Sequence, residues 1–236
     1  MDVLVAHQAL AEESRLTIAQ ALLTQDLAPG EIAERWQLST PLVAHHLNVL
    51  AEAGLVVRRR GEHDGRKSYI ALRHDDPEVV ALVSVGTPVM ASPGRVVFVC
   101  TRSSARSKLA AAWWRRMSKV PALDAGTDPA AAPHPLALHT ASLHSLAVDP
   151  TMRDMDDTVH DEDLVIAVCD HVHETLPGEL PRWHWSIPDP VPAAPPASFD
   201  DACRTIGTRV RDLHHALNPT RNDHTTCPRL MERSPR

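Results

Sequence analysis

A cysteine and an arginine six residues apart stand between a run of β-forming residues and a helical stretch. Cys100 follows residues 96–99 (VVFV), and Arg106 and Ser107 precede the helical residues 110–117. A strand, a tight loop and a helix aim several backbone N–H groups and a helix N-terminus at one point, where an anion binds. The planar guanidinium suits an oxyanion, and positive surroundings favour a thiolate nucleophile. We therefore predict an oxyanion loop with Cys100 as nucleophile, Arg106 as anion ligand and Ser107 as a hydrogen-bond donor to the sulfur.

The spacing Cys-x5-Arg-Ser resembles the phosphate loop of the low-molecular-weight protein tyrosine phosphatases and of the related thiol-dependent arsenate reductases. The resemblance implies that the whole loop holds the anion through Thr101, Arg102, Ser103, Ser104, Ala105 and Arg106. These phosphatases usually carry an x-Asn pair where this chain has Arg102 and Ser103. Asn stabilises a left-handed backbone turn that Ser tolerates less well. The loop residues therefore support a prediction of anion binding more strongly than a prediction of fast turnover.

The same resemblance assigns a general acid to Asp189. In both families an Asp-Pro on a loop far downstream of the cysteine has this role, and Asp189-Pro190 stands in the segment WSIPDPVP. Such an acid protonates the leaving oxygen while the thiolate attacks phosphorus or arsenic. Residues 124–127 (DAGT) resemble the segment that ends the second strand of these phosphatases.

Cys169 has two interpretations. It ends a predicted buried strand over residues 163–168, at the position of the first of two extra cysteines in thioredoxin-coupled arsenate reductases, but Leu176 occupies the second position. Cys169 is therefore either a redox partner that forms a reversible disulfide with Cys100 or a buried strand-end residue. Without an internal thiol relay, arsenate reduction would require a small-molecule thiol or an external redoxin.

Alternating buried strands and helices after residue 95 predict an α/β fold, a doubly wound parallel sheet with the loop at its carboxyl edge. Ser198 and Asp201 predict a capping box that opens the last helix. The apolar stripe of this helix consists of Phe199, Cys203, Ile206, Val210, Leu213 and Leu217.

Residues 1–85 predict a mainly-α winged helix-turn-helix, in which helices precede a hairpin. The Asp64-Gly65 pair marks the hairpin turn. The expected helices and strands cover residues 4–23, 31–36, 40–53, 55–60 and 67–72.

The fragment LSTPLVAHHLNVLAEAGLVVRRR and the later GRKSYIALR resemble the arsenic-repressor (ArsR/SmtB-type) family over about the first 80 residues. The resemblance implies that helix 40–53 enters the major groove and that the wing follows the DNA backbone. Base edges or phosphates would be contacted by Thr40, Leu42, Ala44, His45 and Asn48. Phosphates would be held by Arg58, Arg59, Arg60, Arg66 and Lys67. The family usually forms homodimers, which suit palindromic operators.

The charge distribution supports DNA binding over the alternative, a winged helix used for protein contact. Residues 1–85 carry eight Lys and Arg against twelve Asp and Glu, but five of the eight lie in residues 58–67, where a wing needs them. The net charge of -6 argues against a protein that coats nucleic acid indiscriminately.

No metal site or required cofactor is expected. Many arsenic-repressor relatives bind metals through cysteines on the helix before the recognition helix, and residues 31–36 contain none. The four cysteines are widely spaced, no apolar run reaches membrane-spanning length and the opening residues lack a signal-sequence pattern. We expect a cytoplasmic protein whose ligand is phosphate, arsenate or a similar oxyanion.

The predicted organisation is a DNA-binding domain (1–85), a linker (86–94), a phosphatase-like or arsenate-reductase-like domain (95–217) and a disordered tail (218–236) that holds Cys227. The predicted function is a DNA-binding transcriptional regulator, a repressor, whose second domain senses an oxyanion or thiol redox state through Cys100. The alternative is a bifunctional regulator that is also an active arsenate reductase or protein tyrosine phosphatase. A third option is a catalytically inactive domain kept for dimerisation.

Overall fold

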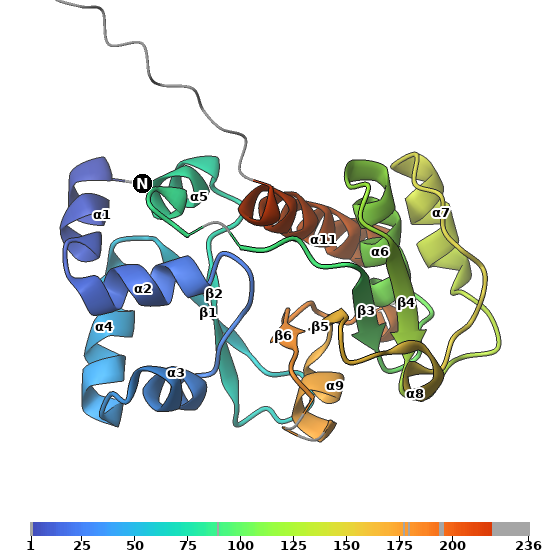
Figure 1. Ribbon diagram of the computed structural model, residues 1–236, viewed down its shortest axis with the longest axis horizontal. Coiled ribbons are helices and arrows are strands. Elements are labelled where there is room, and N and C mark those ends of the chain that lie inside the picture. Colours follow the sequence, from blue (N-terminus) through green and yellow to red (C-terminus); the bar gives the residue numbers. More distant parts are fainter. Residues whose placement is uncertain (1, 89, 177, 179, 194–195, 219–236) are drawn as a thin grey trace, which may run out of the picture.

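The computed structural model describes residues 2–88, 90–176, 178, 180–193 and 196–218. Its N-terminal part is helical and ends in a two-stranded antiparallel hairpin followed by one more helix (Figure 1). The elements are α1 (Val3–Leu10), α2 (Glu13–Ala21), α3 (Pro29–Trp36), α4 (Thr40–Glu52), β1 (Val56–Arg60), β2 (Ser68–Leu72) and α5 (Pro77–Ser84). This order confirms a helix-turn-helix followed by a wing. The expectation did not include α5.

The first helical stretch is two helices, where a single run was expected. The Glu12 carboxylate accepts hydrogen bonds from the backbone N–H groups of Ser14 and Arg15 and so caps a new helix. Farther along, α4 buries Val43 and Leu47 as its apolar spacing predicts. The turn before α4 contains Gln37, whose φ of 53° ends α3 in a left-handed conformation.

The C-terminal domain is a four-stranded parallel sheet with strand order β4-β3-β5-β6. Because β3 lies between β4 and β5, the loop after β3 lies at the point where the chain changes direction across the sheet. The strands are β3 (Val96–Cys100), β4 (Ala122–Gly126), β5 (Leu164–Ala167) and β6 (Trp183–His184). The helices are α6 (Arg106–Met117), α7 (Pro135–Leu143), α8 (Met155–Thr158), α9 (Asp170–Thr175), α10 (Pro190–Ala193) and α11 (Pro196–Leu217). The α/β expectation is confirmed.

The last helix begins earlier than the capping-box pattern predicts. It starts at Pro196, and the Ser198 hydroxyl donates to the Pro190 carbonyl 3.1 Å away, so the predicted cap at Ser198 is wrong. All six residues of the predicted apolar stripe are buried, and α11 packs beside α6 (Figure 1). The predicted tail lies outside the described residues from 219 onward, as does Cys227.

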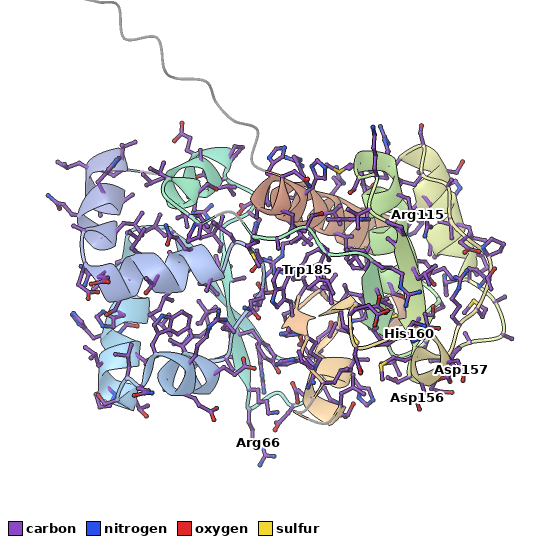
Figure 2. All side chains as sticks on the ribbon, viewed as in Figure 1. Arg66, Arg115, Asp156, Asp157, His160 and Trp185 are labelled. Carbon is purple, nitrogen blue, oxygen red and sulfur yellow. The ribbon has the colours of Figure 1, made fainter. Side chains whose placement is uncertain are left out.

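Buried polar contacts join the two domains around Asp26. Its backbone N–H donates to the His184 carbonyl at 2.7 Å, and its carboxylate accepts from the Ser186 N–H and pairs with the buried Arg209. The Trp185 indole donates to the Thr24 carbonyl at 2.7 Å, and Figure 2 places this side chain at the centre of the molecule. The two domains are thus held together by buried polar contacts as well as by the connecting chain. None of the helices in the described part of the chain has the length and apolar character needed to cross a membrane.

Candidate oxyanion site and nucleic-acid interface

The loop between β3 and α6 lines one side of a cavity of about 400 Å³, whose other walls include His134, His171 and Asp189. Cys100 ends β3, an inner strand of the sheet, where it is 3% exposed, and its Sγ lies 3.2 Å from Ser107 Oγ in the first turn of α6. The predicted nucleophile, arginine and acid line this one cavity, since its walls include Cys100, Arg106 and Asp189. The loop residues on the walls are Thr101, Arg102, Ser104 and Ala105. Ser103 is fully buried and is not part of the walls.

Ser103 adopts the left-handed turn in which these phosphatases usually carry Asn. Its φ is 48°, and its hydroxyl donates to Asp124 Oδ2 at 2.8 Å. The same carboxylate oxygen accepts from Lys108 Nζ at 2.7 Å, and both side chains of this ion pair are fully buried. A Cβ on Gly126 would lie 2.8 Å from the Thr101 carbonyl, so only glycine allows β4 to approach the loop this closely. Asp124 and Lys108 therefore support the loop from beneath.

Arg106 is 7% exposed and is held by three acceptors. Its Nη1 donates to the Ile187 carbonyl at 2.9 Å and to Glu62 Oε2 at 3.2 Å, and its Nη2 donates to Asp189 Oδ2 at 2.9 Å. Burial alone would lower the pKa of the guanidinium, but the sulfur atoms of Cys169 and Cys100, when charged as thiolates, and the two carboxylates outweigh it and raise that pKa. Glu62 comes from the wing of the N-terminal domain and was not predicted to belong to the site.

Two other predicted site residues, Arg102 and Cys169, contact neighbouring side chains. The Arg102 guanidinium is paired with Asp128. Cys169 is buried beside the loop, 3.8 Å from Thr101 Oγ1. Burial raises the pKa of the Cys169 thiol to about 11, although the positive charge of Arg106 opposes this shift. At neutral pH Cys169 is therefore a protonated thiol. Across the described residues, no group of three or more His, Cys, Asp or Glu side chains is arranged to hold a metal ion.

The predicted recognition residues share one exposed side of α4. The residues on this side are Thr40, Leu42, Ala44, His45 and Asn48. The opposite side buries Val43, His46 and Leu47. An exposed helical face of mixed polar and small apolar residues is able to lie in a DNA groove.

The predicted phosphate-binding residues of the wing fall into two groups: exposed side chains and side chains that contact the C-terminal domain. Arg58, Arg60 and Arg66 are exposed, and Figure 2 shows Arg66 pointing away from the molecule at the tip of the hairpin. Arg59, however, donates to the Ser186 carbonyl of the C-terminal domain at 3.3 Å, and Lys67 Nζ lies 3.4 Å from Glu174 Oε2. This contact of Arg59 with the C-terminal domain was not expected from the sequence. Lys67 remains half exposed.

Two family models match this sequence. The model described as low molecular weight phosphotyrosine protein phosphatase matches residues 95–223, and the model described as the MarR family matches residues 14–67. The helix-turn-helix is thus of the MarR type in this comparison, whereas the sequence resemblance favoured the arsenic-repressor type.

Two of the curated relatives are named as operon repressors. The probable mercury resistance operon repressor of Streptomyces lividans is 34% identical over 95 residues, which are 40% of this chain and 72% of the relative. The arsenical resistance operon repressor of Staphylococcus aureus is 34% identical over 65 residues, 28% of this chain and 60% of the relative. Among solved structures, the arsenate reductase from Archaeoglobus fulgidus DSM 4304 is 27% identical with a TM-score of 0.45, and the match covers 50% of this chain and 97% of that one.

Proposed function

Because the chain belongs to the low molecular weight phosphotyrosine protein phosphatase family, we propose that its phosphatase-like domain is the sensor of a DNA-binding repressor and detects an oxyanion or the redox state of Cys100. One observation carries the proposal. The loop and the wing tip line a common cavity of about 450 Å³, whose walls include Glu62, His63, Thr101, Arg106 and Asp189. An event at the loop therefore takes place next to an element that touches DNA in winged helices.

The DNA reader comprises residues 1–85 in this proposal, and the sensor comprises residues 95–217. The repressor relatives support operator DNA as the partner, and the arsenical resistance operon repressor supports the narrower arsenic-repressor assignment. A homodimer on a palindromic operator fits the exposed apolar side chains of α1, since Val3 and Leu4 are 53% and 68% exposed.

Oxyanion binding would use the loop amides, the N-terminus of α6 and the Arg106 guanidinium. Redox sensing would use Cys100 and Cys169. An oxidant of the peroxide class would accept two electrons as the two thiols lose their protons and form an S–S bond, and a small-molecule thiol or redoxin would reverse it.

A second candidate function, enzymatic turnover, is favoured by Asp189 and Cys100 lining the same cavity. Cys100 would attack phosphorus or arsenic, Arg106 and the loop amides would stabilise the equatorial oxygens, and Asp189 would protonate the leaving oxygen. Asp189 is now paired with Arg106, so an incoming anion would have to displace its carboxylate first.

The test uses a palindromic duplex selected by the full-length protein from random sequence. Its affinity is measured with arsenate, phosphate and peroxide for the wild type and for Cys100→Ser. We expect at least one ligand to change the wild-type affinity about fivefold or more. The peroxide response should disappear in the variant. Identical affinities under all conditions would contradict the proposal.

A further inference from the structure

We infer that Glu62 of the wing sets the oxyanion affinity of the loop by competing with the anion for Arg106, so that anion binding releases the wing tip. The inference rests on the proposed function, because it requires an oxyanion to bind the loop. It names Glu62 as the residue that couples anion binding at the loop to the wing.

The carboxylate of Glu62 bridges two residues of the site. Its Oε2 accepts from Arg106 Nη1 at 3.2 Å, and its Oε1 accepts from the Asp189 backbone N–H at 2.6 Å. The Glu62 backbone N–H in turn donates to Asp170 Oδ2 at 2.7 Å. The wing tip is thus fixed to the C-terminal domain by three hydrogen bonds of this single residue.

The arrangement opposes an oxyanion in two ways. A phosphate-like anion is held best by a bidentate contact with the guanidinium fork, and the carboxylates of Glu62 and Asp189 already occupy Nη1 and Nη2 of Arg106. A multiply charged anion would also lie beside these two carboxylates in a partly desolvated cavity. Burial, together with the charges of Asp170 and Asp189, raises the pKa of Glu62 although the Asp189 N–H and Arg106 oppose the shift. An anion therefore binds with less repulsion once the Glu62 carboxylate has left.

Movement of Glu62 is transmitted to the hairpin because the turn is short. Glu62 lies two residues after Arg60, the last residue of β1. A Cβ on Gly61 would be 3.0 Å from the Asp64 carbonyl, which shows how tightly the turn folds on itself. Across the domain boundary, Nδ1 of the neighbouring His63 lies 3.0 Å from Nδ1 of His171. Release of the Glu62 carboxylate therefore removes two of the three hydrogen bonds by which this residue holds the wing tip, and it leaves the bond from the backbone N–H to Asp170.

The experiment compares phosphate binding by the full-length wild type, Glu62→Gln and the matched control Glu162→Gln, using calorimetry. Gln keeps the size of the side chain but removes the charge that competes for Arg106. The exposed Glu162 lies just before β5, at the edge of the sheet opposite to the loop. We expect Glu62→Gln to bind phosphate about tenfold more tightly and the control to match the wild type.

Hydrogen exchange of residues 61–68 gives a second readout. Phosphate should speed exchange of this segment in the wild type, whereas Glu62→Gln should exchange fast without phosphate. Equal phosphate affinities of wild type and Glu62→Gln, with exchange unaffected by phosphate, would overturn this inference and leave the proposed sensor intact. Failure of all three proteins to bind phosphate or arsenate would instead overturn the proposed oxyanion sensing and this inference with it.

Discussion

Asp189 donates its backbone N–H to the Glu62 carboxylate at 2.6 Å, although 127 residues separate the two in the sequence. One belongs to the loop that carries the predicted general acid, and the other belongs to the wing of the DNA-binding domain. Both carboxylates also pair with Arg106. Arg106, the predicted anion ligand, is thus one of the points where the two domains meet through charged groups.

The proposed turnover would depend on Cys100 and Asp189. We expect Cys100→Ser to abolish hydrolysis of p-nitrophenyl phosphate and thiol-dependent arsenate reduction, because the nucleophile is gone. Asp189→Asn should lower kcat about 100-fold or more by removing the proton donor. Steady-state kinetics check both, with Asp201→Asn as an exposed control that should keep wild-type rates. Equal rates for Asp189→Asn and wild type would contradict the role of the acid.

The buried ion pair between Lys108 and Asp124 beside the loop is expected to contribute strongly to the stability of the fold. Asp124→Asn leaves the fully buried Lys108 without its charge partner, which should lower the free energy of unfolding by about 3–5 kcal/mol. Asp128→Asn breaks only the exposed pair with Arg102 and should cost less than about 1 kcal/mol. Urea unfolding of the two variants gives this comparison. A similar small loss for both would argue against the buried pair as the anchor of the Ser103 turn.

DNA binding should depend on Arg66 more than on Arg59. Arg66 lies exposed at the wing tip, so Arg66→Ala should reduce the slope of log affinity against log salt by about one unit. Arg59→Ala should leave that slope unchanged, because its guanidinium faces the C-terminal domain. The measurement is operator affinity over a series of salt concentrations. An equal drop in slope for both variants would place Arg59 on DNA.

Stability should decrease on acidification because of His74 and His184. Burial lowers the pKa of both imidazoles below their ordinary value, although Asp212 and Asp170 respectively oppose the shift. The unfolded chain therefore binds more protons than the folded chain, and the stabilisation present above about pH 6.5 is lost as the pH falls towards the folded pKa values. Urea midpoints at pH 7.5 and 5.5 measure this loss. A His74→Gln variant should lose part of the pH dependence, and an unchanged profile would rule out a contribution from His74.

Local patterns were sufficient for the elements that carry the chemistry. The β-forming run before Cys100 and the helical stretch after Arg106 gave the strand-loop-helix, and the spacing of Val43 and Leu47 gave the buried side of α4. The sequence analysis did not identify β6, α5, α7, α8, α9 or α10. Of these, β6 is only two residues long, and α7 lies in a segment rich in Ala, Pro and His. The division of the N-terminal run into α1 and α2 has no strong sequence signal, because its cap is Glu12 and Glu is not a preferred N-cap residue.

Contacts between segments far apart in the sequence could not be predicted from the sequence alone. Nothing in the neighbourhood of Glu62 marks it as a partner of Arg106, because that contact depends on how the two domains pack. The same holds for Lys108, whose burial is possible only because the end of β4 supplies Asp124. Arg59 was assigned to DNA from its charge and its place in the wing, and only the packed structure reveals its contact with Ser186.

The most direct test of the central claim, that the oxyanion site and the DNA reader are coupled, is the arsenate affinity of the protein with and without its operator. Binding linkage is reciprocal, so the operator must change the arsenate dissociation constant by the same factor by which arsenate changes operator affinity. We predict a difference of about fivefold or more between the free and the operator-bound protein. Identical arsenate dissociation constants in the two states would contradict the account and leave two independent activities on one chain.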